Sequence, residues 1–341
     1  MLQNSDPIVV TGAGGFIGGA LVADLRANGF TCVRAVDVKP FEEWYQRFPD
    51  AENVRLDLRS AEDCRRATRG MQHVFNLAAD MGGMGFIEAH KAECMLSVLV
   101  STHMLAAAKE FGIDRFFYSS SACVYAADKQ TDANVVALKE SDAYPAAPED
   151  GYGWEKLFSE RMCRHFQEDY GLKTRVARYH NVYGPYGTYD GGREKAPAAI
   201  CRKVVSAVLN GSNEIEIWGD GEQSRSFTYI DDCVYGTKAL INSDVIEPLN
   251  VGSDQLVTIN EMVDIVEGIA GVKLRRNYKL DAPKGVRGRN SDNALIKEKL
   301  GWAPSIRLED GLAKTYAWIH DQMRAGGLSA PVQRDAAGAA H

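Results

Sequence analysis

The sequence lacks several features that would place it among membrane, secreted or zinc-binding proteins. No apolar run reaches the roughly 20 residues that span a bilayer, and Met1–Pro7 has neither the basic start nor the apolar stretch of a secretory signal. No two cysteines are spaced C-x-x-C, and no cysteine–histidine cluster has zinc-ligand spacing. The seven scattered cysteines are typical of reduced thiols. We therefore expect a soluble cytoplasmic protein with no bound metal.

The sequence also has fewer basic than acidic residues. The chain has 39 lysine and arginine residues against 46 aspartates and glutamates, a formal net charge of −7. Nucleic acids and anionic membranes attract basic surfaces, so we expect neither as a partner. Local basic clusters would still suit a phosphorylated small molecule. The 341 residues, 45% hydrophobic and 25% charged, are ordinary for a globular protein of about two domains.

Short apolar segments in the first half alternate with segments of helical periodicity. The strand-like segments are Ile8–Thr11, Cys32–Val36, Val54–Leu58, His73–Leu77 and Arg115–Ser119, with a sixth at Thr174–Arg178. The helical segments are Phe16–Asn28, Ala61–Thr68, Phe86–Phe111 and Tyr152–Tyr170. This alternation predicts the α/β class, with a Rossmann-type doubly wound parallel sheet.

The first strand and the first helix are joined by a glycine-rich turn, Thr11–Gly18, with the spacing G-x-x-G-x-x-G. Glycine permits a tight turn and a close approach to a pyrophosphate, and the helix N-terminus supplies free N–H donors. Because the turn follows a strand and opens an amphipathic helix, it predicts a dinucleotide site. The residues of this predicted site are Gly12, Gly15, Phe16, Ile17 and Gly18.

Two carboxylates follow the next strands. Asp37 is placed to accept hydrogen bonds from an adenosine ribose, which favours NAD because it would repel a 2′-phosphate. Lys39, two residues on, would instead suit a 2′-phosphate. Asp57 and Leu58 are placed to meet the adenine. For both carboxylates the ordinary alternative is a solvated residue at a strand end.

After Asn181 the alternation of strand-like and helical segments ends. Glycine and proline at Gly184–Gly187 and Gly191-Gly192 predict loops there. Short helices and strands follow, among them Ala196–Leu209, Glu214–Trp218, Ile259–Ala270 and Leu308–Met323. We expect an NAD-binding Rossmann domain over residues 1–180, which the chain rejoins around residues 227–252. A smaller C-terminal substrate-binding lobe would occupy mainly residues 181–325, followed by a disordered tail over residues 326–341.

Tyr152 and Lys156 lie four residues apart at the start of a predicted helix, which places them on one face. A nearby ammonium stabilises a phenolate and so lowers the pKa of the tyrosine. One residue of the strand end Ser119–Ser121 would hold a substrate hydroxyl beside it. A Y-x-x-x-K pair is weak alone, but with the glycine turn it indicates hydride-transfer chemistry.

These features together resemble the extended short-chain dehydrogenase/reductase family of nucleotide-sugar enzymes. Two further stretches, Arg225–Asp232 and Leu249–Gly252, look like downstream motifs of that family. The resemblance covers the chain to about Met323. It implies bound NAD, a C-terminal lobe that binds the substrate, and often a homodimer formed by two long helices per subunit. Here those helices would be Phe86–Phe111 and Tyr152–Tyr170.

Within that family the loops are most similar to those of the GDP-mannose 3,5-epimerases. The matching runs are Asn76–Phe86, Ser120–Tyr125, Gly191–Ala199, Trp218–Gly221 and Gly285–Asn293. The resemblance implies that GDP-mannose, or a related nucleotide sugar, is oxidised at C4 by NAD. The hydrogens at C3 and C5 then become acidic, and inversion through an enolate followed by reduction gives GDP-L-galactose or GDP-L-gulose.

The resemblance also implies residue roles. Tyr152, Lys156 and Ser121 would serve the C4 step, and Cys123 with Lys195 would be the acid/base pair for inversion. Ala78 would join the cofactor site. The implied substrate contacts are Gly82, Ser121, Ala122, Cys123, Asn181, Glu194, Lys195, Ala196, Lys203, Gln223, Ser224, Arg225 and Arg289, with Arg202 as a further phosphate candidate and Arg287 as a substitute for Arg289. The ordinary alternatives are a buried apolar cysteine and a solvated lysine.

Three other functions stay open at this point. A 4,6-dehydratase of the family carries an Asp-Glu pair where this chain has Ala122-Cys123, and a 4-epimerase would leave Cys123 and Lys195 unexplained. A non-catalytic NAD-binding scaffold predicts loss of Tyr152 or Lys156. The chain departs from the epimerase pattern at Ala126-Ala127 and within Asp128–Ala137, which leaves base preference and product ratio open.

Overall fold

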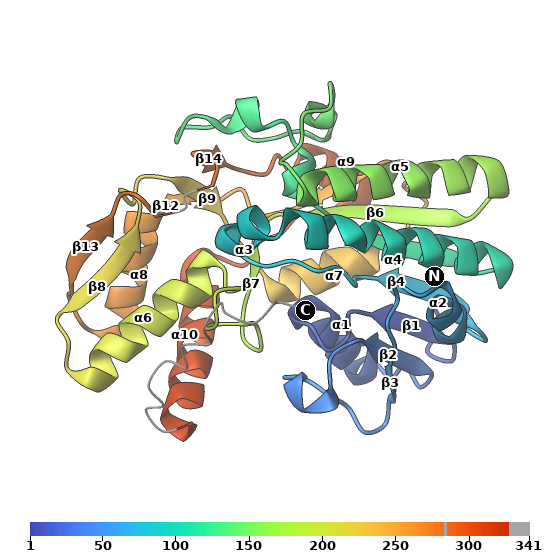
Figure 1. The fold of residues 1–341 in the computed structure, drawn as a ribbon, viewed down its shortest axis with the longest axis horizontal. Helices are drawn as coiled ribbons and strands as arrows, with labels where there is room; N and C mark the ends of the chain where they lie inside the picture. The colour runs from blue at the N-terminus through green and yellow to red at the C-terminus, as the bar shows by residue number, and fades with distance from the viewer. Residues whose placement is uncertain (283–284, 327–341) are drawn as a thin grey trace, which may run out of the picture.

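A sheet of seven parallel strands forms the centre of the protein in the computed structural model, which describes residues 1–282 and 285–326 (Figure 1). The strand order is β11-β6-β5-β4-β1-β2-β3. The bounds are β1 Ile8–Thr11, β2 Val33–Asp37, β3 Glu52–Arg55, β4 His73–Asn76, β5 Arg115–Ser121, β6 Lys173–Tyr179 and β11 Leu249–Val251. The order reverses at β1, which pairs with β2 on one side and β4 on the other. The predicted Rossmann-type class is confirmed.

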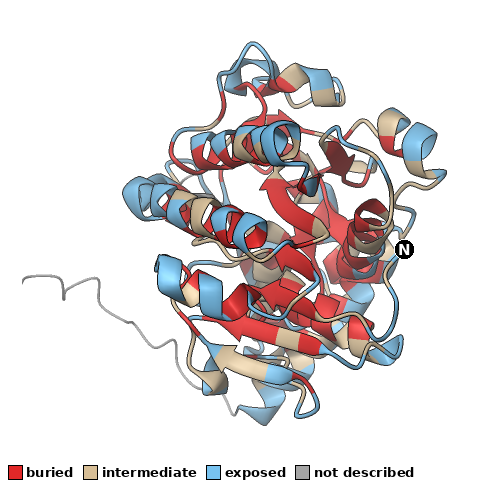
Figure 2. Ribbon diagram, turned by 90° about the vertical axis from the view of Figure 1, so that its right-hand side faces the viewer, coloured by how far each residue is buried: buried red, intermediate tan, exposed pale blue. Residues whose placement is uncertain are grey.

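Helices cover both faces of this sheet, as Figures 1 and 2 show. One face carries α2 (Ala61–Thr68), α4 (Lys91–Glu110) and α5 (Tyr152–Tyr170), and the other carries α1 (Phe16–Ala27) and α7 (Ile230–Ile241). Each side has its own apolar core, and the inner strands are buried on both faces. Strands enclosed in this way read as short apolar runs, which explains why the sequence revealed them. None of the helices in the described ranges is both long and apolar enough to cross a membrane.

One expected helix, Phe86–Phe111, is two helices, α3 (Met84–Ala89) and α4, separated at His90. His90 has φ −128° and ψ 45°, and its Nδ1 lies 3.0 Å from the carbonyl oxygen of Phe86. Its ring stacks on that of Phe86, with 4.3 Å between ring centroids. No glycine or proline in the sequence marks this break.

The second lobe consists of three helices and short strands. The helices are α6 (Ala196–Asn210), α8 (Ile259–Ala270) and α10 (Leu308–Ala325). One two-stranded sheet pairs β8 (Glu214–Trp218) with β13 (Arg275–Lys279), and another pairs β7 (Val182–Tyr183) with β10 (Thr228–Tyr229). In a three-stranded sheet, β9 (Ser224–Ser226) lies between β12 (Leu256–Thr258) and β14 (Gly288–Arg289). α9 (Ala294–Leu300) contacts β11. The apolar core of the lobe is continuous with that of the sheet face under α1 and α7. Apart from Gly326, the predicted tail lies outside the described residues.

A buried ion pair joins α5 to β6 near the edge where the strands end. The carboxylate of Glu160 accepts hydrogen bonds from Nε and Nη2 of Arg178, at 2.9 and 2.7 Å, and both side chains are buried. Arg178 also donates to the hydroxyl of Tyr125, at 3.3 Å, and Tyr125 donates to Asn250 on β11. The pair therefore fixes the strand ends that carry the site described below.

We expect Glu160→Ala to lower the free energy of unfolding by about 3–5 kcal/mol, because it leaves the Arg178 guanidinium buried without its counter-charge. Chemical denaturation followed by circular dichroism measures this loss. Glu168→Ala on the same helix is the control, since Glu168 pairs with the exposed Arg164 at 2.7 Å and should matter much less. Equal losses in the two variants would contradict the account.

Candidate active site

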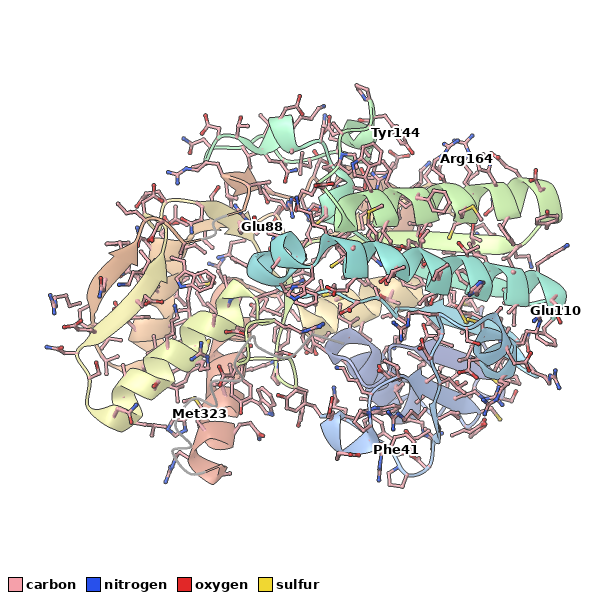
Figure 3. The ribbon with its side chains drawn as sticks, viewed as in Figure 1. Phe41, Glu88, Glu110, Tyr144, Arg164 and Met323 are labelled. Atoms are coloured by element: carbon pink, nitrogen blue, oxygen red, sulfur yellow. The ribbon has the colours of Figure 1, made fainter. Side chains whose placement is uncertain are left out.

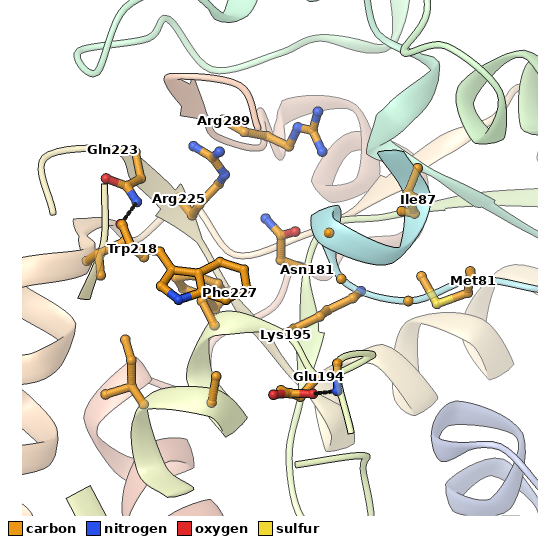
Figure 4. Close-up of a pocket in the computed structure, with 18 of the residues that line it drawn as sticks. Met81, Ile87, Asn181, Glu194, Lys195, Trp218, Gln223, Arg225, Phe227 and Arg289 are labelled. Carbon is orange, nitrogen blue, oxygen red and sulfur yellow. Dashed lines mark hydrogen bonds between the residues drawn. The ribbon is translucent and has the colours of Figure 1, made fainter. Parts of the chain in front are cut away.

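A cavity of about 350 Å³ lies where the carboxyl ends of the central strands face the second lobe (Figure 4). Ser121 and Tyr179 are paired at the last position of the β5–β6 register and both line the cavity. Doubly wound folds place their ligands at this edge, beyond the carboxyl ends of the strands. The other walls come from the start of α5, the segment around α3, and the second lobe.

Most of the residues predicted for chemistry and substrate meet in this cavity. Those that line it are Gly82, Ser121, Ala122, Cys123, Tyr152, Asn181, Glu194, Lys195, Ala196, Arg202, Lys203, Gln223, Arg225 and Arg289. Three residues are placed elsewhere. Lys156 is buried one helical turn after Tyr152, Ser224 is buried with its hydroxyl donating to Ala133, and Arg287 pairs with Asp220 at 2.9 Å.

Tyr152 opens α5, and its surroundings differ from the expectation. The ammonium of Lys156 lies 5.3 Å from the centroid of the Tyr152 ring, but 3.5 Å from the carboxylate of Glu155, which the sequence had not singled out. Burial raises the pKa of Tyr152 well above its ordinary value, and Cys123 and Glu155 raise it further. A hydrogen bond with Ser121 acts in the lowering direction. Desolvation is the largest of these effects.

Cys123 and Lys195 reach the cavity from two separate loops. Cys123 sits in a short 3₁₀ turn directly after β5, where its N–H donates to the hydroxyl of Ser121 at 3.2 Å. Lys195 immediately precedes α6, and burial lowers its pKa while Cys123 opposes the shift. Its ammonium makes no hydrogen bond or ion pair with any described residue. A desolvated lysine close to a thiol is suited to exchanging protons.

Cationic and polar side chains enter the cavity from other elements, and Figure 4 shows Arg225, Arg289 and Asn181 among them. Arg225 donates to the carbonyl of Ser224 at 2.7 Å, and burial lowers its pKa to about 10. Lys203 donates to the carbonyl of Glu216 at 3.0 Å, and burial lowers its pKa too. These groups suit a diphosphate.

Glu216 and Trp218 are among the cavity residues that were not predicted as site residues, although Trp218 lies in a motif that the resemblance used. Glu216 and Trp218 stand two residues apart on β8 and both line the cavity. The indole N–H of Trp218 donates to the Glu216 carboxylate at 2.9 Å, and Gln223 donates to the Trp218 carbonyl at 3.0 Å (Figure 4). The signal in the sequence was the alternation Glu-Ile-Glu-Ile-Trp, which places Glu216 and Trp218 on the face of β8 opposite the buried isoleucines.

The glycine turn has the geometry of a dinucleotide cradle. Gly12 has φ +71°, and a Cβ on Gly18 would lie 2.1 Å from the Gly12 carbonyl oxygen, so glycine is required at both positions. The first-turn amides of Phe16 and Ile17 on α1 have no acceptor among the described residues. Free N–H groups at a helix N-terminus fit a pyrophosphate.

The remaining residues predicted for the cofactor lie around this turn. The carboxylate of Asp37 accepts from the amides of Gly14 and Lys39, each at 3.0 Å, so it is held at the mouth of the turn. The amide of Ala78 donates to Thr11 at 3.2 Å. Asp57 is engaged by the Arg59 guanidinium, which lowers the pKa of the carboxyl. Leu58 is buried.

Fold and site together define an extended short-chain dehydrogenase/reductase: a doubly wound sheet, a glycine turn at the first helix, and a Ser-Tyr-Lys group beside a cavity in a second lobe. Comparison with known proteins narrows this class. A model described as the NAD dependent epimerase/dehydratase family matches residues 8–252. The chain belongs to that family.

Individual relatives cover nearly the whole chain. It is 50% identical over 317 residues to GDP-mannose 3,5-epimerase of Arabidopsis thaliana and to GDP-mannose 3,5-epimerase 1 of Oryza sativa subsp. japonica, covering 93% of this chain and 82% of each relative. Among solved structures it is similar to UDP-glucose 4-epimerase from Thermotoga maritima, with TM-score 0.82 and 28% identity over 93% of this chain and 99% of that one.

Proposed function

We propose that the protein is a GDP-mannose 3,5-epimerase, which converts GDP-mannose to GDP-L-galactose and GDP-L-gulose through transient oxidation at C4. One observation carries this proposal: Cys123 and Lys195 line the same cavity as Tyr152 and Ser121. The site therefore holds a second acid/base pair besides the group that serves hydride transfer. Its relatives among the GDP-mannose 3,5-epimerases support the choice of sugar nucleotide.

In the C4 step, Ser121 holds the C4 hydroxyl and Tyr152 exchanges the hydroxyl proton. Lys156 supplies positive charge beside Tyr152, while Glu155 fixes its ammonium. The glycine turn and Asp37 would hold NAD, which would supply a reversible hydride acceptor for C4 and a positive charge near Tyr152. Positive charge lowers the pKa of a buried phenol, so Tyr152 can then act as a base.

In the inversion steps, the C4 ketone makes the hydrogens at C3 and C5 acidic. Cys123 takes a proton from one face of the sugar ring, and Lys195 delivers one to the opposite face. The lowered pKa of Lys195 eases that delivery, because a desolvated ammonium gives up its proton more readily. Lys203, Arg225 and Arg202 would hold the diphosphate, and Asn181 and Gln223 the sugar and nucleoside.

The products of the native protein test this proposal. We expect GDP-mannose to be converted to GDP-L-galactose and GDP-L-gulose, identified by NMR, while UDP-glucose supplied in parallel stays unchanged. Inversion at C4 alone would indicate a 4-epimerase, and a 4-keto-6-deoxy sugar a dehydratase. Retained NAD without turnover of any sugar nucleotide would indicate a scaffold. Each of these outcomes would overturn the proposal.

We further propose a homodimer formed through α4 and α5, which pack side by side (Figure 3). Their outer faces expose large apolar side chains: Met95, Leu96 and Leu99 on α4, and Trp154 and Phe158 on α5. Exposed apolar side chains on two neighbouring parallel helices suit a second copy, which would complete a four-helix bundle.

The seven free cysteines support a reducing compartment such as the cytoplasm.

We expect Phe158→Glu to convert the dimer to a monomer, because it would bury a carboxylate from each copy in the apolar contact. Analytical ultracentrifugation measures the mass. The control is Ile246→Glu, since Ile246 is 60% exposed and lies in the loop before β11, away from α4 and α5. A native protein that sediments at the mass of one chain would contradict the proposed dimer.

A further inference from the structure

A buried cluster of four residues backs the cavity at Cys123. Nη1 of Arg289 lies 3.7 Å from the Cys123 sulfur, and Nε donates to the side-chain carbonyl of Gln130 at 2.6 Å. Nη2 of Arg289 forms an ion pair with the carboxylate of Glu149. Glu149 is itself anchored, because its amide donates to the Cys123 carbonyl at 3.1 Å. The guanidinium is thus held against the thiol from two sides.

Positively charged side chains surround this thiol. Besides Arg289, Lys195 and Arg225 both interact electrostatically with Cys123. Cations favour the thiolate. Glu149 opposes them, and its side chain is only 10% exposed, so solvent screens it little.

The proposed reaction requires the Cys123 sulfur both to accept a proton and to give it up again. In each inversion a C–H bond breaks, its electron pair forms the enolate, and the proton bonds to the Cys123 sulfur. A proton from the Lys195 ammonium then forms the new C–H bond on the opposite face. Before the next inversion the thiol must pass its proton back to the neutral Lys195 amine. A thiolate stabilised too strongly by cations would not accept the first proton.

We propose that Glu149 is a positioning residue for these proton transfers: it holds Arg289 against Cys123 and offsets part of the positive charge on the thiol. The role in epimerisation rests on the proposed function. The effect on the thiol does not, because it can be measured without any sugar. Glu149→Gln is the informative change, since the amide oxygen still accepts from Arg289 while the charge is removed.

Alkylation of Cys123 by iodoacetamide, followed by mass spectrometry of its peptide between about pH 5 and pH 9, tests the inference. Removing a negative charge favours the thiolate, so in Glu149→Gln the acid limb of the alkylation profile should move to lower pH. At the acid end the rate should rise roughly tenfold. Glu149→Asp keeps the charge and should stay near the native profile. Asp150→Asn is the control, because the exposed Asp150 pairs with Lys91 at 2.7 Å.

An unchanged profile in Glu149→Gln, or equal shifts in Glu149→Gln and Glu149→Asp, would overturn the inference. If Glu149→Gln does not fold, Arg289→Gln is tested instead. Its effect on the alkylation rate should be opposite, because loss of a cation disfavours the thiolate and slows alkylation at the acid end. NAD content and thermal unfolding report folding. If native protein incorporates no deuterium into GDP-mannose, the proposed function fails while the alkylation result stands.

Discussion

Replacing Tyr152 by phenylalanine should lower turnover of GDP-mannose by roughly 10³-fold, while the protein keeps its NAD. The phenol is the group placed to exchange the C4 hydroxyl proton, and general acid–base groups contribute about 10²–10⁴-fold. The ring of Tyr152 still fills its place at the start of α5, so the cavity should keep its shape. Steady-state kinetics measure turnover, and assay of the NAD released when the protein is denatured measures its retention.

The matched control is Tyr183→Phe. Tyr183 is also buried, but it donates to the Leu308 carbonyl at 3.2 Å and does not line the cavity. We expect this variant to keep near-native turnover with a small loss of stability. Undiminished turnover in Tyr152→Phe would remove Tyr152 from the mechanism.

Cys123→Ala should separate the two halves of the reaction. We expect loss of epimerised product by at least about 10²-fold, because the base that abstracts the C3 or C5 proton is gone. Oxidation at C4 uses Tyr152 and should continue, so mixing with GDP-mannose should still produce a transient of reduced nicotinamide absorbance. Stopped-flow absorbance and product analysis by NMR measure the two steps in one preparation.

Cys163→Ala is the control for the loss of a thiol. Cys163 is fully buried on α5, outside the cavity, and burial raises its pKa far above the range in which it would react. That variant should be less stable but active. If Cys123→Ala still formed both epimers at the native rate, the thiol would be structural and the proposed pair wrong.

The sheet could be predicted from the sequence because enclosed parallel strands leave a local signal, a short apolar run. Local reasoning failed at boundaries that no glycine or proline marks. His90 divides the helix expected over Phe86–Phe111. The third strand, expected at Val54–Leu58, is Glu52–Arg55, since Ser60 caps α2 and the chain must already turn there.

The site was predictable only where its residues lie in motifs. Gly12 and Tyr152 have fixed spacing to a strand or helix. Glu149 and Gln130 had no such signal. Glu149 lies in a loop, Gln130 ends a short 3₁₀ helix, and both contact Arg289, which is more than a hundred residues away in sequence. The raised pKa of Tyr152 could not be predicted either, since neither its burial nor the carboxylate of Glu155 can be read from spacing.

Deuterium incorporation by the native protein reports whether protons are exchanged at C3 and C5. GDP-mannose is incubated with the holoenzyme in deuterated water, and substrate and products are examined by NMR over time. We expect deuterium at C3 and C5 and none at C4, because hydride leaves and returns there without meeting solvent. Turnover without deuterium at C3 or C5, or active protein with no exchange at all, would contradict the proposed epimerisation.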